Sequence, residues 1–283
     1  MNTSTPRIVF FGTPDICLPI LDALSLHGYA PAAVITNPDR PVGRKHVLTP
    51  PPVKIWAQEK NIPVHQPEKL DDNFYAWYRN QSYDIALVVA YGKIIPERII
   101  VTPVHGTLNI HYSLLPRWRG ASPVESAILH GDTMTGVCIQ KMVYELDAGD
   151  ILSEIQVPIH DTDTTPTLRA RLNTLGAHML VDLLPRYIEG TVTPQPQSLA
   201  GMTKCTKIKK EDGCIDIHNL DHEHVWRMYR AYTPWPGIFF FDAMGKRVKI
   251  TEMSYANNQC IIEKVIPEGK SEMSFEEWNK RNT

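Results

Sequence analysis

Cysteine is scarce in this chain of 283 residues, with five copies at widely separated positions and no Cys-x-x-Cys pair. An odd number at such spacings argues against a disulfide framework and against a zinc site. This pattern is typical of a protein in a reducing compartment. We therefore expect a cytoplasmic location and no bound metal.

Long hydrophobic runs and an excess of one charge are also lacking. No apolar segment approaches the length of a membrane span, and residues 1–7 lack the basic-then-apolar order of a signal peptide. The formal net charge of −2 excludes a global basic field but permits local basic patches. With 43% hydrophobic residues, the chain suits one large or two modest soluble domains and no membrane partner.

The first two thirds of the chain alternates short apolar runs with helical segments. Runs at 8–11, 32–36 and 84–90 are typical of strands buried on both faces of a parallel sheet. This alternation predicts an α/β fold with a doubly wound, mostly parallel, Rossmann-like sheet. The other expected elements are helices over 15–27, 53–60 and 71–80, strands over 108–111, 136–142 and 151–157, and a long helix with Thr165 as its N-cap.

The composition of the chain and the pattern of its expected elements change after residue 189. Residues 190–203 have the Pro, Thr and Gln content of a semi-rigid linker. A helix near 221–232, followed by strands over 238–242, 247–255 and 259–266, then predicts a small β-rich domain. We therefore expect a first domain at 1–189, a linker at 190–203 and a second domain at 204–283.

Three polar side chains point to acyl-transfer chemistry. Asn109 and His111 are two positions apart on a short strand and so share one face, and Asp147 follows in an acidic loop. An amide donor stabilises a developing oxyanion, a histidine handles a proton, and a carboxylate orients the imidazole. Each residue alone has a simpler structural explanation. Together, at the carboxyl end of a parallel strand, they predict a catalytic site.

The motifs of the chain resemble those of the methionyl-tRNA formyltransferases along almost its whole length. The Asn-x-His and Asp constellation is shared by the wider formyltransferase superfamily, whereas the Pro-Asp-Arg-Pro, Pro-Val-Lys and Pro-Arg-Trp-Arg-Gly segments are narrower and favour the tRNA-directed enzymes. The matching motifs are Phe10-Phe-Gly-Thr-Pro-Asp15, Pro38-Asp-Arg-Pro-Val-Gly-Arg44, Pro51-Pro-Val-Lys54, Val89-Ala-Tyr-Gly92, Asn109-Ile-His111, Ser113-Leu-Leu-Pro-Arg-Trp-Arg-Gly-Ala-Ser-Pro123, Leu146-Asp-Ala-Gly-Asp150 and Trp235-Pro-Gly237.

This resemblance implies a formyltransferase fold in the first domain and an OB-like β domain at the C-terminus. It implies transfer of the formyl group of 10-formyltetrahydrofolate to the α-amine of methionyl initiator tRNA, for translation initiation, without a metal. Asn109, His111 and Asp147 would be catalytic. The folate co-substrate would contact Ser113, Leu114, Leu115 and Pro116, and its pteridine would lie against Val89, Ala90, Tyr91 and Gly92.

The resemblance also assigns basic residues to tRNA. The loop at 37–49 would enter the acceptor end, with Arg40, Arg44 and Lys45 contacting phosphates or an unpaired base. In the second domain, Lys207 stands among four lysines within seven residues and would contact the tRNA backbone. We expect the protein to act as a monomer.

Three features depart from the family pattern. Lys45, His46 and Val47 stand where the family has a glycine and two lysines, which predicts weaker and less salt-sensitive tRNA binding. Tyr112 replaces a small residue, and its ring is expected to narrow the folate entrance. The chain after Tyr255 is short for a five-stranded barrel, which predicts a shortened OB-like domain with an exposed sheet edge.

Two other functions remain open. A sugar-nucleotide amine N-formyltransferase would use the same three residues and the same co-substrate, but such enzymes lack the basic Pro-Asp-Arg-Pro-Val-Gly-Arg loop. A catalytically impaired folate- or RNA-binding homologue would accommodate Tyr112 and the shortened second domain. The intact catalytic trio argues against that reading.

Overall fold

The structure is a computed structural model and describes residues 5–43 and 46–282. The chain forms two compact units. The first holds the chain up to Arg119 together with Gly136–Gln156 and Ala170–Thr203, and the second holds Gly120–Thr135, Val157–Arg169 and the chain from Lys204 onward. The domain limits proposed above remain predictions.

The first unit is built on a seven-stranded sheet with the strand order β10-β9-β7-β6-β1-β2-β5. β1 pairs in parallel with β2 and β6, β2 with β5, and β6 with β7, whereas β9 is antiparallel to β7. This confirms the doubly wound, mostly parallel sheet. The strands are β1 (Ile8–Gly12), β2 (Ala33–Ile35), β5 (Val64–His65), β6 (Ile85–Val89), β7 (Thr107–His111), β9 (Met134–Lys141) and β10 (Ile151–Pro158).

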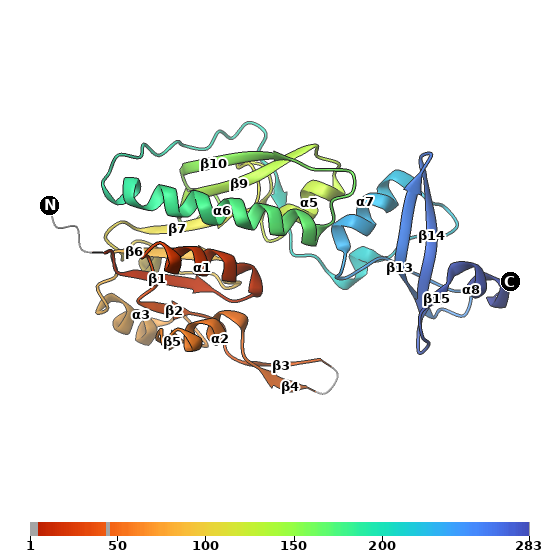
Figure 1. Cartoon of the computed structure of the whole chain (residues 1–283), viewed down its shortest axis with the longest axis horizontal. Coiled ribbons are helices and arrows are strands. Elements are labelled where there is room, and N and C mark those ends of the chain that lie inside the picture. The colour runs from red at the N-terminus through yellow and green to blue at the C-terminus, as the bar shows by residue number, and fades with distance from the viewer. Residues whose placement is uncertain (1–4, 44–45, 283) are drawn as a thin grey trace. The chain divides into compact units, whose positions relative to one another are not determined.

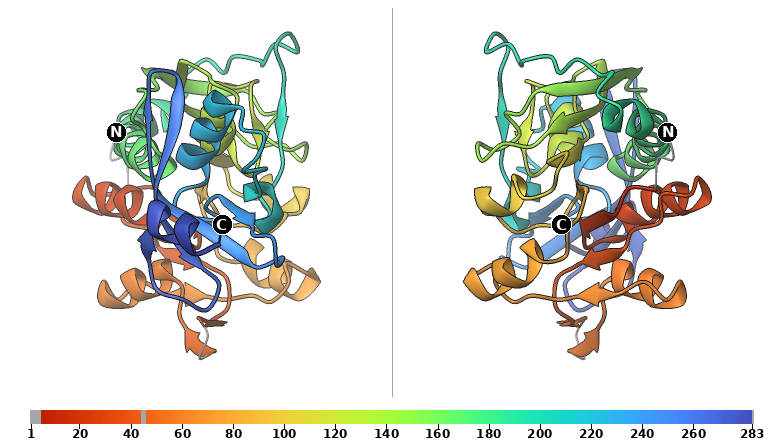
Figure 2. Two further views of the ribbon diagram at one scale, coloured as in Figure 1. Left: turned by 90° about the vertical axis from the view of Figure 1, so that its right-hand side faces the viewer. Right: turned by 90° about the vertical axis from the view of Figure 1, so that its left-hand side faces the viewer.

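Helices lie on both faces of this sheet (Figures 1 and 2). On one face, Phe11 and Val88 pack with Phe74 and Tyr78 in a buried cluster. On the other, Gly176 lies so close to Ile110 and Val137 that a Cβ on the glycine would be 3.3 Å from each. The helices of this unit are η1 (Asp15–Cys17), α1 (Leu18–Leu26), α2 (Pro52–Glu59), α3 (Asp72–Arg79), α4 (Glu97–Ile100) and, from Ala170 onward, α6 (Thr165–Ile188).

Two predictions about the first unit need correction. Thr165 is already helical, and the amide of Leu168 donates to the carbonyl of Thr164, so the cap lies one residue earlier than expected. The predicted irregular loop at 37–49 contains an antiparallel hairpin, β3 (Arg40–Val42) and β4 (Val47–Thr49). Strands of three residues are too short to show a hydrophobic period, which explains why the sequence did not indicate them.

The second unit carries a four-stranded antiparallel sheet with the order β12-β13-β14-β15. This confirms the small β-rich region expected at the C-terminus. The last strand and helix were not predicted. The elements are α5 (Pro123–Leu129), η2 (Lys210–Gly213), α7 (His222–Tyr232), β12 (Phe239–Phe241), β13 (Arg247–Ala256), β14 (Gln259–Pro267), β15 (Met273–Ser274) and α8 (Phe275–Asn282); β8 (Arg119–Gly120) pairs with β11 (Lys204–Cys205).

No helix within residues 5–43 and 46–282 has the length and apolarity that a bilayer crossing requires. No group of three or more His, Cys, Asp and Glu side chains in the same residues is arranged to hold a metal ion.

Candidate functional site

Strand β7 brings two of the predicted catalytic residues to one face of the sheet. Asn109 is the register partner of Val88 on β6 and therefore points to the same face, toward which His111 also points two residues later. His111 is the last residue of β7, at the carboxyl end of a parallel strand. In doubly wound folds, ligands bind outside these strand ends.

The acidic loop between β9 and β10 carries Asp147 to this place. Oδ1 of Asp147 lies 3.5 Å from Nδ2 of Asn109, and Oδ2 lies 3.7 Å from Nδ1 of His111. The side chain of Asp147 is 12% exposed and that of His111 is 6% exposed. The structure thus brings Asn109, His111 and Asp147 together, although Asn109 and Asp147 are 38 positions apart in the sequence.

The hydrogen bonds of His111 fix its neutral tautomer. Nε2 lies 2.9 Å from the carbonyl oxygen of Trp118, which can only accept, so the proton of the neutral ring sits on Nε2. Nδ1 then presents a lone pair beside Oδ2 of Asp147. The free lone pair of this tautomer is therefore on Nδ1, the ring nitrogen that faces Asp147.

The backbone of the acidic loop is constrained at two positions. Asp147 has a φ of +50°, a left-handed conformation that non-glycine residues rarely adopt. Gly149 lies so close to β9 that a Cβ there would be 1.8 Å from the carbonyl oxygen of Lys141. Such a loop conformation persists only where surrounding contacts hold it.

Two glutamines supply those contacts, and the sequence analysis did not identify either. Nε2 of Gln140 donates to Oδ1 of Asp147 at 3.0 Å, and its Oε1 accepts from the amide of Gly149 at 3.1 Å. Nε2 of Gln197 donates to the carbonyls of Asp147 and Gly149 at 2.9 and 2.7 Å. Gln140 is the register partner of Asn109, a signal that becomes visible only when the strand order is known.

The residues predicted to contact folate fall into two groups. Val89 and Tyr91 are buried, and the Tyr91 ring packs on Phe11, whereas Ala90 and Gly92 are exposed with φ of +47° and +81°. The carbonyl of Tyr91 accepts from Thr13 and Asn37. Of these four residues, Ala90 and Gly92 are therefore the ones that face solvent.

The second folate group follows β7 directly. Ser113 and Leu115 are buried, and Leu114 and Pro116 are half-buried. Oγ of Ser113 donates to the carbonyl of Arg117 at 2.6 Å, which closes a tight turn with a cis bond between Leu115 and Pro116. This turn leads to Trp118, whose carbonyl holds His111.

The ring of Tyr112 does not lie on the catalytic face. It is buried, and its hydroxyl donates to Oδ1 of Asn173 on α6 at 2.8 Å. Successive strand residues point to opposite faces, so the ring lies behind the sheet. The expectation that Tyr112 narrows the folate entrance is therefore wrong.

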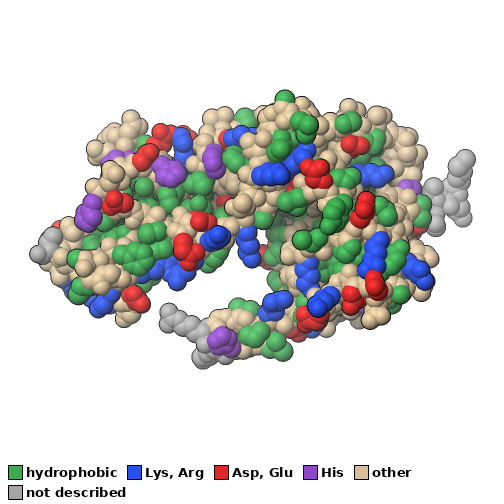
Figure 3. All heavy atoms as spheres, turned by 180° about the vertical axis from the view of Figure 1, so that it is seen from behind, with side chains coloured by type: hydrophobic (Ala, Val, Ile, Leu, Met, Phe, Trp, Pro, Cys, Tyr) green, Lys and Arg blue, Asp and Glu red, His purple; other side chains and the backbone are tan. Residues whose placement is uncertain are grey.

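The predicted tRNA-binding residues lie partly outside the described residues. Arg44 and Lys45 are not among them, whereas Arg40 is exposed on β3 and Lys207 is exposed in the second unit. The β3–β4 hairpin protrudes from the first unit (Figures 1 and 2). On the face drawn in Figure 3, Lys and Arg side chains are interspersed with Asp and Glu.

An ion pair holds the base of this hairpin. Nζ of Lys54 donates to both carboxylate oxygens of Asp39 at 2.8 and 2.7 Å, and Nε2 of Gln66 donates to Oδ1 at 2.7 Å. These hydrogen bonds, that from Gln66 first, lower the pKa of Asp39. The Pro-Val-Lys motif thus supplies a structural contact beside the hairpin.

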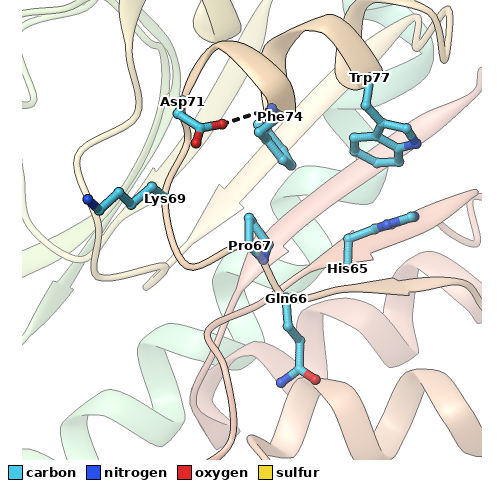
Figure 4. A pocket seen from close by; sticks show the side chains of 7 residues that line it. All are labelled: His65, Gln66, Pro67, Lys69, Asp71, Phe74 and Trp77. Atoms are coloured by element: carbon cyan, nitrogen blue, oxygen red, sulfur yellow. Dashed lines mark hydrogen bonds between the residues drawn. The ribbon is translucent and has the colours of Figure 1, made fainter.

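A separate hollow of about 410 Å³ lies between α3 and the chain that follows β5 (Figure 4). Its polar groups serve the fold, since Asp71 caps α3 through the amide of Phe74 and Gln66 holds Asp39. The lining residues are His65, Gln66, Pro67, Lys69, Asp71, Phe74 and Trp77, which differ from the predicted site residues.

The fold places the chain in the class of doubly wound α/β proteins, and Asn109, His111 and Asp147 lie together near the carboxyl end of a central strand. Comparison with known families narrows this class. Residues 6–184 match the formyl transferase family and residues 207–260 match its C-terminal domain, so the chain belongs to the formyl transferases.

Relatives of known name show a closer likeness. The chain is 41% identical over 254 residues to a methionyl-tRNA formyltransferase of Listeria monocytogenes serovar 1/2a, covering 89% of this chain and 80% of the relative. It is 43% identical over 231 residues to that of Geobacillus sp. (strain WCH70), covering 81% and 72%.

Solved structures share the fold at lower identity. A sugar N-formyltransferase from Shewanella sp. FDAARGOS_354 matches with a TM-score of 0.69 at 15% identity, over 88% of this chain and 98% of that one. HypX from Aquifex aeolicus in complex with tetrahydrofolic acid matches with a TM-score of 0.63 at 16% identity, over 96% and 46%.

Proposed function

We propose that this formyl-transferring enzyme moves the formyl group of 10-formyltetrahydrofolate to the α-amine of methionyl initiator tRNA. The observation that carries the proposal is the convergence of Asn109, His111 and Asp147 in a chain 41–43% identical to methionyl-tRNA formyltransferases. The sugar-directed enzymes are 14–18% identical, a likeness that extends to the fold alone.

Asn109 is the candidate donor for the oxygen on which negative charge develops. Its Nδ2 is held 3.5 Å from Oδ1 of Asp147, a long contact that leaves the amide able to donate elsewhere. Removing one such donor typically costs about 10²–10³ in rate. Asn109 is half-buried on β7, two residues before the end of the strand.

His111 is the candidate acceptor for the proton of the attacking amine. Its lone pair sits on Nδ1, and Oδ2 of Asp147, 3.7 Å away, stabilises the imidazolium that forms. Free α-amines have a pKa of about 8, so roughly a fifth of the amine is already neutral at physiological pH. Asp147 orients the ring. When the bond between the formyl carbon and N10 of the folate breaks, the imidazolium returns the proton to N10, and tetrahydrofolate leaves.

Folate is the co-substrate that the family and the site support best. It supplies an activated formyl group on a ring-linked nitrogen. The exposed backbone at Ala90 and Gly92 suits the hydrogen-bonding edge of a planar heterocycle. Oδ1 of Asn37, buried beside Tyr91, has no hydrogen-bond partner among residues 5–43 and 46–282. These groups follow the carboxyl ends of β6 and β2, which flank β1 in the sheet, and the order of the strands along the chain reverses between β1 and β6.

The acceptor end of tRNA would be guided by the β3–β4 hairpin and by Lys207. The hairpin is exposed, carries Arg40 and is fixed at its base by Asp39 and Lys54. An arginine head contacts phosphates or unpaired bases through several planar donors. This arrangement favours an RNA acceptor over an amino sugar.

The test is mass detection of N-formylmethionine after mixing the protein, methionyl initiator tRNA and 10-formyltetrahydrofolate, with an amino-sugar nucleotide as competitor. We expect formylation of the tRNA-bound methionine and none of the sugar. Formylation of the sugar alone would refute the proposed acceptor, and free formate as the sole product would refute the transfer.

A further inference from the structure

We infer that Gln197 is a positioning residue that holds the Asp147 loop in its catalytic conformation. Gln197 lies in the stretch 190–203, which the sequence presents as a passive linker. The inference rests on the proposed function of the trio, because it assigns Gln197 a role through Asp147. It adds a determinant of catalysis that comes from outside the family's Asn-x-His and Asp motifs.

The carboxamide of Gln197 uses all of its hydrogen-bonding capacity at this place. Both donors of Nε2 are engaged, by the carbonyls of Asp147 at 2.9 Å and Gly149 at 2.7 Å. Oε1 accepts twice from Arg119, from Nε at 3.0 Å and from Nη2 at 2.8 Å. A carboxamide offers two donors and one oxygen with two lone pairs, so its capacity is filled.

These bonds hold a segment of the acidic loop that is partly exposed and has a constrained backbone. Glu145 and Leu146 are exposed, whereas Asp147 adopts a left-handed backbone and Gly149 packs against Lys141. Gln197 binds the carbonyls on both sides of Ala148 and so fixes the peptide planes that aim the Asp147 side chain. A buried Arg119, 3% exposed, fixes Gln197 in turn.

The same stretch also supports His111. Oγ1 of Thr203 accepts from the amide of Trp118 at 2.9 Å, and the carbonyl of Thr203 accepts from the amide of Arg119 at 3.0 Å. These bonds hold the peptide segment whose carbonyl accepts from Nε2 of His111. The stretch thus contacts both the carboxylate side and the imidazole side of the trio.

The first variant is Gln197→Ala, with Gln195→Ala as the matched control. Gln195 is two residues away and exposed, and among the described residues its side chain donates to the carbonyl of Thr193, at 3.4 Å. Its backbone pairs with Ile151 independently of the side chain. Since misplacing a catalytic group by about 1 Å costs roughly 10²-fold, we expect Gln197→Ala to lower kcat about 10- to 100-fold. KM for both substrates should stay within about two-fold of the parent value, because a change that affects only the chemical step leaves substrate binding unaltered.

The second variant, Gln197→Glu, separates positioning of the loop from support of Arg119. A glutamate keeps an acceptor for Arg119 but replaces both donors with oxygens that repel the carbonyls of Asp147 and Gly149. We expect a loss of kcat at least as large as in Gln197→Ala. Activity equal to that of the parent would show that Arg119 is the true partner and would overturn the inference.

Hydrogen exchange supplies a readout that does not depend on turnover. Mass spectrometry of peptides covering residues 145–150 should show faster exchange in both Gln197 variants and parent-like exchange in Gln195→Ala. Unchanged exchange in Gln197→Ala, or a kcat within two-fold of the parent, would overturn the inference. If the parent protein fails to formylate methionyl-tRNA, the proposed function fails, while the exchange result still decides whether Gln197 holds the loop.

Discussion

The two ring nitrogens of His111 face different groups, and these groups decide which nitrogen carries a proton. The Trp118 carbonyl keeps a proton on Nε2, and the Asp147 carboxylate faces Nδ1. A proton that arrives at Nδ1 therefore meets a negative charge already in place. In the proposed mechanism, Nδ1 is the nitrogen that accepts the proton of the amine, and Asp147 stabilises the imidazolium.

Replacing the ring tests this assignment. We expect His111→Ala to lower kcat by about 10²–10⁴, the range that positioned acid–base groups typically contribute. The midpoint of thermal unfolding should remain high enough for a fully folded enzyme at the assay temperature. Steady-state formylation assays with circular dichroism would measure both quantities.

His27→Ala is the control for this substitution, because His27 is exposed and bonds only within its own helix end, to the carbonyl of Ala23. It should keep parent-like kcat. Near-normal turnover in His111→Ala would remove the imidazole from the mechanism.

Substitution of Gly149 tests whether the backbone position of the acidic loop determines activity. In Gly149→Ala the new methyl group would meet the Lys141 carbonyl at 1.8 Å, and because the obstacle is backbone, the loop must move. Asp147 would move with it, so we expect kcat to fall by roughly 10²-fold with a smaller change in folate affinity. A variant with parent-like kcat and an unmoved loop in its crystal structure would contradict this account.

At the scale of elements, the hairpin depends on a contact at its base. β3 and β4 have three residues each, and Val42, Val47 and Leu48 are exposed, so apolar burial contributes little to holding the pair in place. The bonds of Asp39 with Lys54 and Gln66 tie the chain before β3 to α2 and to the end of β5. We infer that these bonds set the direction in which the hairpin protrudes.

Substitution of the carboxylate should affect tRNA and not folate. We expect Asp39→Asn to raise KM for methionyl-tRNA several-fold while KM for 10-formyltetrahydrofolate stays unchanged, with Glu59→Gln at the exposed end of α2 as control. Equal rises in both KM values would show that the substitution disturbs the whole site.

The lowered pKa of Asp39 predicts that the stability of the protein depends on pH. The native pKa of Asp39 is lowered from its usual 3.8 by the hydrogen bonds from Gln66 and Lys54. The contribution of the ionised Asp39 carboxylate to the free energy of unfolding is therefore complete above pH 3.8. It is lost as the pH falls through the lowered native pKa. The difference in unfolding free energy between the parent and Asp39→Asn should be constant near neutrality and shrink in acid, as measured by urea unfolding.

The long and strongly patterned elements were predictable, and the short ones were not. The continuous apolar runs of β1 and β6 identified buried parallel strands to within a residue or two, because burial on both faces leaves no room for polar residues. The hairpin strands, β15 and α8 were missed, since their residues are largely exposed and carry little hydrophobic period.

For the site, spacing identified the residues on one strand but not their supports. Asn109 and His111 share a face because they are two apart, a rule that holds for any strand. Gln140 and Gln197 reach Asp147 from a neighbouring strand and from a stretch 50 residues away. Nothing in their local sequence distinguishes them from surface glutamines.

At the scale of the whole molecule, the net charge of −2 means that tRNA binding must depend on a few local cations. Each phosphate contact contributes about one unit to the slope of log K against log salt. We expect Lys207→Ala to weaken tRNA binding and reduce this slope by about one. Filter binding over a range of salt concentrations would measure both.

Lys270→Ala is the control for Lys207→Ala, because Lys270 is also exposed in the second unit. It should leave the slope unchanged, and folate affinity should be the same in both variants. An unchanged slope in Lys207→Ala would remove this lysine from the tRNA contact.

The most direct measurement of the central claim is a single-turnover reaction with ¹³C-formyl-labelled folate and methionyl initiator tRNA, run with the parent and with Asp147→Asn. The account predicts that the label reaches the methionine amine in the first turnover of the parent. It also predicts that Asp147→Asn binds the folate normally but transfers the label at least about 100-fold more slowly. Equal transfer rates in the two proteins, or label recovered only as formate, would contradict it.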